Sequence, residues 1–325
     1  MNQGNEGKQR SADPVLVTGA SGFLGAALVK AMAGQRLVYA LSRRPAIPGA
    51  EPLAVDLTRG EEVGRLLEAI PFATCIHAAA LADPDLCETD PETAWRVNVE
   101  GTRHLLEVCQ RRRKRFLFLS TDYVFDGRKQ EPYIEEDPVC PLQVYGATKA
   151  EAEKLVLEIP QNLVIRLPFL FGYAPPPERT DFATDTLLRL WMEQPASYDN
   201  QQLRSPLLRE EAAEAIRLMA DSSLSGIIHL VPSETATKFD LARAFAHYLG
   251  KPAGLVREKK GEESGARARR PPSMRLSNEK FLQALSDRFR FRPLRDSIVR
   301  VAERFRSDAE SSRRATGIST GQTSK

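Results

Sequence analysis

The chain of 325 residues is predicted to adopt an α/β fold with a doubly wound parallel sheet and helices on both faces. First, short β-rich runs alternate with helical stretches over the first half of the chain. Second, the glycine-spaced segment GASGFLG, at residues 19–25, separates the first β-rich run from the first helical stretch. Third, this rhythm breaks after Arg166, which indicates a smaller, discontinuous lobe in the later part of the chain.

Six β-rich runs are expected to form the sheet. They lie at residues 15–17, 37–41, 53–55, 74–77, 116–120 and 163–166. The first helix carries Leu24, Leu28 and Met32 on one stripe, and the segments 91–112 and 151–158 have the mixed faces of helices that cover a sheet. Right-handed crossovers would bring the carboxyl ends of these strands to one edge, where ligands bind in such folds.

The later half is expected to divide between the sheet and the lobe. After a proline-rich segment, helices are predicted at 181–193, 209–220, 239–249, 277–286 and 294–305, with a further strand at 227–231. The predicted sheet domain therefore contains residues 14–166 and about 207–231, and the lobe contains about 167–206 and 232–306. Residues 1–13 and 307–325 are polar and without periodicity, so disordered tails are expected there.

The composition excludes several classes of protein. The net charge is only +3, and the basic run at 111–115 lacks interleaved aromatic residues, so no nucleic-acid partner is expected. No apolar stretch is long enough for a membrane span, so no membrane partner is predicted. The cysteines show neither CxxC nor metal-ligand spacing, which predicts no metal site and a reduced, cytoplasmic protein: Cys75, Cys87, Cys109 and Cys140.

The glycine-spaced segment has the context of a dinucleotide-binding loop. It follows a predicted strand and opens a predicted helix, whose N-terminus offers unpaired N–H groups and positive potential to a pyrophosphate. The alternative is a tight turn that binds nothing. The Rossmann interpretation assigns cofactor contacts to Gly19, Ser21, Gly22, Phe23, Leu24 and Gly25.

The end of the second predicted strand indicates which dinucleotide is bound. An acidic residue at this position would hydrogen-bond the ribose of NAD, but this chain has Ser42, Arg43 and Arg44. Guanidinium groups can clamp the extra phosphate of NADP. NADP (as NADPH) is therefore the predicted cofactor, and NAD remains possible.

The run YGATK places Tyr145 and Lys149 about one helical turn apart, on one face. Together with GASGFLG and the serine and threonine of STDYVFDG, this run resembles the extended short-chain dehydrogenase/reductase family. That resemblance implies that Tyr145 protonates the alkoxide formed by hydride transfer, and Lys149 is expected to lower the pKa of the phenol. It also implies that Tyr145 and Lys149 contact the cofactor, with Lys149 at the nicotinamide ribose. Thr121 would hydrogen-bond the substrate carbonyl. The alternative is a surface packing pair beside a capped turn.

Within this family, four segments resemble the dTDP-4-dehydrorhamnose reductase group: STDYVFDG at 120–127, YGATK, VIRLPFLFG at 164–172 and RPPSMRL at 270–276. The resemblance implies an oxidoreductase that uses NADPH to reduce the 4-keto group of a nucleotide-linked deoxysugar, with a homodimer as a possible assembly. It also implies further roles: Asp56 and Leu57 at the adenine, Ala78, Ala79 and Ala80 beside the ribose and pyrophosphate, Asn98 in support of Lys149, and Asp122 and Phe169 at the sugar.

Departures from the group's pattern fall on the substrate side. Phe169 stands where the group has a tryptophan, and Arg204 and Leu207 stand where it has glycine and threonine. Arg166 and Arg270 could bind substrate phosphates or form structural ion pairs. Two other functions stay open: a cofactor-binding regulatory subunit similar to the β subunit of methionine adenosyltransferase, and a nucleotide-sugar epimerase or dehydratase.

Overall fold

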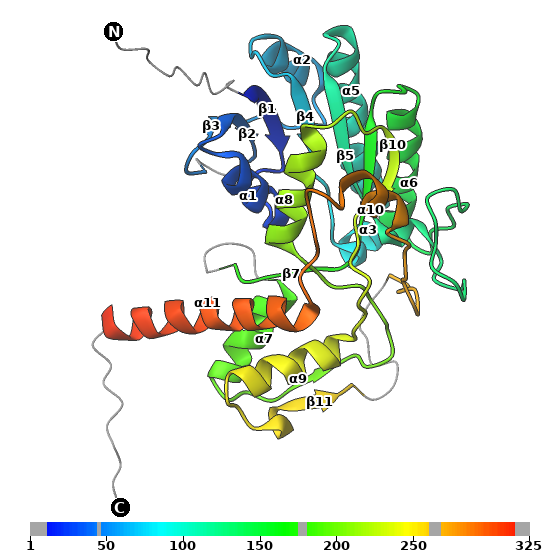
Figure 1. Ribbon diagram of the computed structural model, residues 1–325. Helices are drawn as coiled ribbons and strands as arrows, with labels where there is room; N and C mark the ends of the chain where they lie inside the picture. The colour runs from blue at the N-terminus through cyan, green and yellow to red at the C-terminus, as the bar shows by residue number, and fades with distance from the viewer. Residues whose placement is uncertain (1–11, 44–46, 175–180, 260–267, 316–325) are drawn as a thin grey trace, which may run out of the picture.

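The computed structural model describes residues 12–43, 47–174, 181–259 and 268–315. Its upper half in Figure 1 is a seven-stranded sheet in the order β10-β6-β5-β4-β1-β2-β3, and every neighbouring pair is parallel. The strands are β1 Ala12–Thr18, β2 Arg36–Leu41, β3 Glu51–Leu53, β4 Thr74–His77, β5 Arg115–Thr121, β6 Leu163–Leu167 and β10 Gly226–His229. The predicted doubly wound sheet is confirmed.

Helices cover both faces of the sheet because its strands bury side chains on both sides. In β1, Val15 and Val17 pack with the helices of one face, whereas Leu16 packs with those of the other. The first face holds α1 Phe23–Met32, α8 Arg209–Ala220 and α10 Glu279–Leu285; the second holds α2 Gly60–Glu68, α5 Gly101–Arg111 and α6 Val144–Leu157. Because the strands are buried on both faces, their sequences are continuous apolar runs.

A short helical segment precedes α5 at the carboxyl edge of the sheet. It contains α3 Pro84–Thr89 and α4 Pro91–Trp95, followed by a π-helical turn, Arg96–Glu100, that leads directly into α5. Asp83 and Asp90 cap α3 and α4 with their side chains, and a proline follows each cap. The predicted helix at 91–112 is therefore continuous but contains one wide turn.

The smaller lobe lies below the sheet in Figure 1. Helices α7 Phe182–Trp191, α9 Lys238–Tyr248 and α11 Leu294–Ala315 surround a second core, which includes Phe171, Phe245 and Phe305. Strand β8 Ala196–Tyr198 pairs with β11 Val256–Glu258 at its edge. Strands β7 Leu170–Phe171 and β9 Leu207–Leu208 pair where the chain crosses between the two parts.

Two predicted boundaries differ from the structure. Phe281, Leu285 and Phe289 pack into the core with α1 and α8, so the α10 segment joins the sheet domain although the predicted lobe included it. Disorder was predicted from residue 307, which is wrong for 307–315 because α11 continues to Ala315. A helix whose first turns are packed in a core can extend through polar residues, because adding a turn to an existing helix avoids the cost of nucleation. The tail predicted at 1–13 lies outside the described residues up to residue 11, and Ala12 begins β1.

The described residues were also predicted to lack membrane spans, metal sites and disulfides. No helix among them is long and apolar enough to cross a membrane. The same residues contain no group of three His, Cys, Asp or Glu side chains that could hold a metal ion. All four cysteines are free thiols, and only Cys140 is exposed.

Candidate active site

A cavity of about 360 Å³ opens at the carboxyl edge of the sheet, where β1, β4, β5 and β6 end. It brings the glycine-spaced loop and the YGATK helix to one place, as the sequence predicted. Its lining consists of Gly19, Gly22, Phe23, Leu24, Gly25, Ala78, Ala80, Ala82, Leu119, Ser120, Thr121, Tyr145, Lys149, Leu167, Pro168, Leu170 and Asp181.

The glycine-spaced loop lies directly against the loop that follows β4. Gly19 has a φ of +65°, and a Cβ atom there would lie 2.6 Å from the backbone nitrogen of Ala79. A Cβ on Gly25 would lie 2.0 Å from the carbonyl oxygen of Gly19. Glycine is therefore required for both the backbone conformation and the close packing of this turn.

The N-terminus of α1 faces the cavity and fits a phosphate group. Gly22 is its N-cap residue and offers no side chain to bond the first N–H groups, and Phe23, Leu24 and Gly25 line the cavity. Ser21 is half-buried in the same turn. Helix N-terminal N–H groups that lack a side-chain cap bind phosphate through hydrogen bonds and the helix dipole.

The structure describes only some of the residues that were predicted to contact the adenosine part of the cofactor. Ser42 is buried and Arg43 is exposed, whereas Arg44 lies outside the described residues. Asp56 accepts hydrogen bonds from the backbone N and the Oγ1 of Thr58; these bonds, with a smaller contribution from Arg43, lower its pKa. Leu57 is buried. Arg43 and Asp56 thus lie close enough to interact electrostatically, which fits two loops that border one ligand.

A chain of buried hydrogen bonds joins the turn after β1 to helix α6. His77 Nδ1 lies 2.6 Å from Thr18 Oγ1, and its Nε2 lies 3.0 Å from Thr102 Oγ1. Thr102 donates to the carbonyl oxygen of Asn98, whose side chain donates to Thr148 Oγ1, and Thr148 donates to the carbonyl oxygen of Tyr145. The Oγ1 of Thr18 also accepts from the backbone nitrogen of Ala79.

The predicted support of Lys149 by Asn98 is not among the described side-chain contacts of Asn98. Its Oδ1 accepts from the backbone N of Leu81 at 2.8 Å, and its Nδ2 donates to the carbonyl oxygen of Leu81 and to Thr148. It is 1% exposed and does not line the cavity. The described contacts of Asn98 therefore hold the backbone of Leu81 against α6 and do not include Lys149.

Three predicted catalytic side chains do meet at the cavity: Thr121 at the end of β5, and Tyr145 and Lys149 on α6. The ring of Tyr145 contacts that of Tyr123 edge-on at 6.4 Å. The amine of Lys149 lies 3.8 Å from the centroid of the Phe118 ring. Thr121 Oγ1 accepts from the backbone N of Tyr123, which fixes the side chain at the turn after β5.

The pKa values of these groups follow from burial. Burial, with a contribution from Asp122, raises the pKa of Tyr145, and a hydrogen bond with Thr121 acts in the opposite direction. The expected lowering of this pKa by Lys149 is not found. Burial lowers the pKa of Lys149 to about 7, opposed by the nearby Glu153. Tyr145 is therefore fully protonated at neutral pH, as a proton donor must be, whereas Lys149 is partly neutral.

Asp122 and Ser120 each carry a buried oxygen without a hydrogen-bond partner in the described structure. Asp122 is 4% exposed, its Oδ2 is unpartnered, and burial raises its pKa to about 6. Ser120 Oγ is equally unpartnered and lines the cavity. Buried polar atoms that the protein leaves unbonded are candidates for ligand contacts.

Some lining residues were not singled out from the sequence. Ser120 could have been found, because it directly precedes Thr121 in the STDYVFDG motif. Asp181 caps α7, where it accepts from the backbone N of Ala183 and Thr184, and the cap pattern was its only signal. The apolar lining residues Leu119, Leu167, Pro168 and Leu170 look like ordinary strand residues in the sequence.

Two arginines proposed for phosphate binding have carboxylate partners. Arg166 is buried and forms an ion pair with Glu153 at 2.8 Å, so it is a structural residue of the β6–α6 contact. Arg270 pairs with Asp85 at 3.0 Å but stays partly exposed. Phe169 lies beside the cavity between the lining residues Pro168 and Leu170, and its ring contacts that of Phe182 at 5.7 Å.

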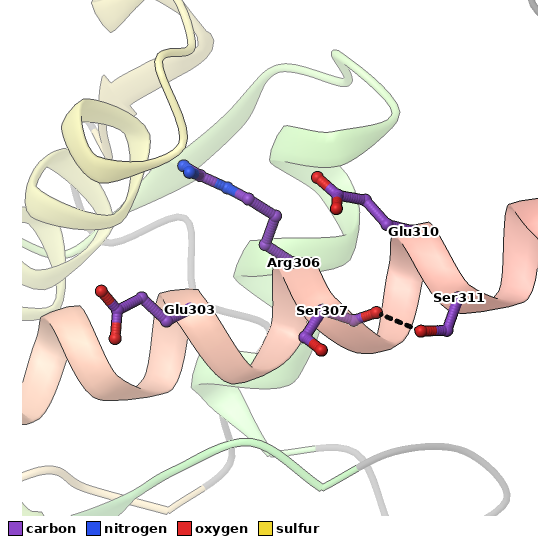
Figure 2. A pocket seen from close by; sticks show the side chains of 5 residues that line it. All are labelled: Glu303, Arg306, Ser307, Glu310 and Ser311. Atoms are coloured by element: carbon purple, nitrogen blue, oxygen red, sulfur yellow. Dashed lines mark hydrogen bonds between the residues drawn. The ribbon is translucent and has the colours of Figure 1, made fainter.

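A second depression lies on α11, far along the chain from these motifs. Figure 2 shows its residues along one helix, and the hydroxyl of Ser311 donates to the carbonyl oxygen of Ser307. Arg306 donates to the carbonyl oxygen of Tyr248 and so ties α11 to α9. One helix supplies the whole lining of this depression, whereas the cavity at the sheet edge gathers the predicted site residues from several elements and is therefore the candidate functional site.

The chain is similar to several known proteins. The family model described as "RmlD substrate binding domain" matches residues 13–307. Methionine adenosyltransferase 2 subunit beta of Rattus norvegicus is 32% identical over 252 residues, which are 75% of this chain and 74% of the relative. The dTDP-4-keto-6-deoxy-D-glucose reductase of Streptomyces niveus is 30% identical over 248 residues, 75% of this chain and 82% of the relative. The solved dTDP-4-dehydrorhamnose reductase of Bacillus anthracis in complex with NADP has a TM-score of 0.75 at 24% identity, covering 91% of this chain and 99% of its own.

Proposed function

Because the chain belongs to the RmlD substrate-binding-domain family, we propose that it is an NADPH-dependent reductase of the 4-keto group of a nucleotide-linked deoxysugar. The observation that carries this proposal is the single cavity that joins Tyr145, Lys149 and Thr121 to the glycine-spaced loop. Carbonyl reduction by a dinucleotide requires two parts: a loop that fits the pyrophosphate, and a protonated phenol near the carbonyl.

In this mechanism the chain positions the substrate carbonyl and delivers one proton. Reduced nicotinamide, when bound, would supply the hydride. The Oγ1 of Thr121 donates to Asp122 Oδ1 at 3.2 Å in the structure and would turn its hydrogen to the carbonyl oxygen of a bound substrate. Tyr145 would give its phenolic proton to the same oxygen as negative charge develops there. The amine of Lys149, on the same face of α6 and with a pKa near 7, can return a proton to the phenolate afterwards.

The preference for NADP is supported by the loop after β2. Arg43 is exposed there, and the described part of this loop supplies no carboxylate for the 2′-hydroxyl of NAD. The solved relative from Bacillus anthracis holds NADP. Titration with NADPH and NADH, with Arg43→Ala as the test variant, would show a preference for NADPH that the variant loses.

The test of the reaction is NADPH consumption against a panel of nucleotide-linked 4-keto sugars. Wild-type protein is expected to oxidise NADPH with at least one of them. Tyr145→Phe should lower kcat by roughly 100-fold or more, because the proton donor is gone, while NADPH binding is retained. Normal turnover by a folded Tyr145→Phe protein would remove the phenol from the mechanism.

A cofactor-binding regulatory subunit is the second candidate. The 32% identity with methionine adenosyltransferase 2 subunit beta supports it, and the cavity residues alone do not distinguish a bound cofactor from a consumed one. Tight NADPH binding without consumption, together with co-purification of an unrelated enzyme, would favour this candidate. An epimerase or dehydratase would convert its sugar without net consumption of NADPH.

A homodimer in the cytoplasm remains part of the proposal. Trp95 at the end of α4 and Leu157 at the end of α6 are exposed large apolar side chains on neighbouring helices, which suits contact with a second copy. The four free thiols fit a reducing compartment. Sedimentation of the purified chain would measure the mass of the assembly directly.

A further inference from the structure

Arg209, the first residue of α8, is a buried cation beside the cavity. It is 5% exposed, and the dipole of its own helix opposes a positive charge at this N-terminal position. The guanidinium donates to Glu210 Oε1 at 3.0 Å, and Glu210 lies partly in solvent. Because a charge is costly to bury, a half-exposed partner alone does not explain why an arginine stands here.

The other described contacts of Arg209 join three segments of the chain. Its Nη2 donates to the carbonyl oxygen of Tyr173 at 2.8 Å, and its Nη1 donates to the carbonyl oxygen of Phe23 at 3.4 Å. The guanidinium carbon lies 4.7 Å from the centroid of the Phe23 ring. Gly172 leaves room for the side chain, because a Cβ there would lie 3.0 Å from Arg209 Cγ. One guanidinium therefore connects α8, the start of α1 and the chain that follows β7.

Phe23 carries this contact to the cavity. It is the first residue of α1, and it lines the cavity together with Gly22 and Leu24. The N–H groups of a first helical turn lack intrahelical partners, so a pyrophosphate can accept hydrogen bonds from them. Arg209 contacts both the ring and the carbonyl oxygen of Phe23. It therefore restrains the side chain and the backbone of the residue at which α1 faces the cavity.

The charge of Arg209 also acts on the rim of the cavity. Among the described lining residues, Lys149 supplies the cation and Asp181 the carboxylate. Burial raises the pKa of Asp181, whereas hydrogen bonds with Thr184 and Ala183 and the charge of Arg209 oppose this rise. Since Asp181 would repel a phosphate, Arg209 could favour a dinucleotide by its charge alone, and an experiment must separate this effect from its contact with Phe23.

We propose that Arg209 is a positioning residue for the dinucleotide, which holds Phe23 and the first turn of α1 in the position that binds the pyrophosphate. The proposal rests on the proposed use of NADPH and adds a residue that lies outside the described cavity lining. Arg209 acts through Phe23, because Phe23 is the lining residue that its guanidinium contacts. The planar fork lies over the ring while it donates to two carbonyl oxygens, a combination that the amine of a lysine does not supply.

The first test measures NADPH binding by calorimetry without a sugar. Arg209→Met is expected to weaken binding about tenfold, because the contact with the ring is lost. Arg209→Lys should weaken binding nearly as much, since it keeps the charge but not the planar fork. Arg217→Met is the matched control, because Arg217 is another arginine of α8 that pairs with a glutamate, Glu214, and it should bind NADPH as the wild type does.

A double-mutant cycle shows whether Arg209 acts through the ring. Phe23→Leu removes the ring and leaves the bonds of Arg209 to Glu210 and Tyr173 available. In the Phe23→Leu background, Arg209→Met should change the NADPH dissociation constant by less than about twofold. The full effect of Arg209→Met in both backgrounds would overturn the proposal. Wild-type affinity in Arg209→Lys would also overturn it, because charge alone would then be sufficient.

Two further measurements separate positioning from a general structural role. With a sugar that is reduced, Arg209→Met should raise the KM for NADPH about tenfold and leave kcat at saturating NADPH unchanged. A lower kcat with an unchanged KM would refute the proposal. If Arg209→Met does not fold, Phe23→Leu and Arg209→Lys test the same contact, and wild-type affinity in both would refute it. NADPH binding that depends on Arg209 and Phe23, without turnover of any sugar, would contradict the reductase function and leave the positioning role standing.

Discussion

Gly19 fixes the shape of the loop after β1 and, under the proposed function, the approach of the dinucleotide to that loop. Gly19→Ala should destabilise the fold by more than about 1 kcal/mol and abolish dinucleotide binding, because the new methyl group would meet the backbone of Ala79 at φ +65°. Gly34 is the matched control, since it also has a positive φ, +85°, but open space around its Cβ position. Gly34→Ala should therefore show the backbone strain alone.

Urea denaturation and NADPH titration of the two variants measure these effects. Equal losses of stability would mean that the contact with Ala79 is relieved by a small shift of the loop. Retained NADPH affinity in Gly19→Ala would contradict the close approach of this turn to the pyrophosphate.

Lys149 should make stability depend on pH. Its pKa falls from 10.5 in the unfolded chain to about 7 in the folded protein, so the unfolded state holds one more proton between these values. Stability from this group therefore rises as the pH increases from about 7, by at most about 1.4 kcal/mol per pH unit. Lys149→Met removes this rise. The variant should therefore be more stable than the wild type near pH 7, and this difference in the free energy of unfolding should shrink as the pH increases.

Denaturation of wild type and Lys149→Met across this pH range checks the sign. Lys154→Met, which removes an exposed lysine of the same helix, should follow the wild-type profile. A stability difference between Lys149→Met and wild type that stayed constant from pH 7 to about 10 would show that Lys149 keeps its ordinary pKa.

Also at the residue scale, the sequence predicted the cavity residues that belong to recognisable motifs. It did not predict the cavity residues that stand outside such motifs. Tyr145, Lys149 and Thr121 stand in segments whose spacing is recognisable, and the structure brings them to the cavity. Asp181 follows a proline-rich segment, and its cap pattern predicts the start of a helix but not a place at the cavity. The backbone partner of Asn98, Leu81, was equally invisible, because hydrogen bonds to backbone atoms leave no trace in residue types.

At the scale of elements, α6 is held to β6 by a buried ion pair. Arg166 and Glu153 are 3% and 4% exposed at the side chain, so removal of one charge leaves the other buried without a partner. Glu153→Gln should therefore lower the free energy of unfolding by about 3–5 kcal/mol. The exposed pair between Lys154 and Glu151 on the same helix should contribute less than about 0.5 kcal/mol.

Chemical denaturation of Glu153→Gln and Glu151→Gln compares the two pairs within one helix. A loss below about 1 kcal/mol for Glu153→Gln would mean that water or other groups compensate Arg166. The carbonyl oxygen of Glu135 and the ring of His229 are the neighbours of Arg166 that could rearrange.

The strands were predictable because each is buried on both faces, which leaves an apolar run bounded by turn residues. Helices α2 and α3 were not predicted. Only Val63 and Leu67 of α2 are buried, and α3 has six residues with Cys87 alone buried. Such helices are stabilised by neighbouring elements and capping residues more than by an apolar stripe. Their own sequences therefore give little indication of a helix.

At the scale of the whole molecule, the sheet domain and the lobe each have their own core. Phe305 of α11 is 1% exposed and contacts the rings of Tyr173 and Trp191 in the lobe core. Phe305→Ala should lower stability by about 3–5 kcal/mol and raise amide exchange in α7 and α9 more than in β4 and β5.

Hydrogen exchange with peptide resolution measures where the protection is lost. Met192→Ala, at a side chain 56% exposed in the same lobe, should change stability by less than about 0.5 kcal/mol. A uniform loss of protection across both parts would show that they unfold as one cooperative unit.

The buried chain of hydrogen bonds from Thr18 through His77 and Asn98 to α6 has a mechanical consequence. It couples the turn after β1 to the helix that carries Tyr145 and Lys149, so a substitution that displaces one end would also shift the other. The side chains of the lobe are not part of this chain, so substitutions there leave these hydrogen bonds in place.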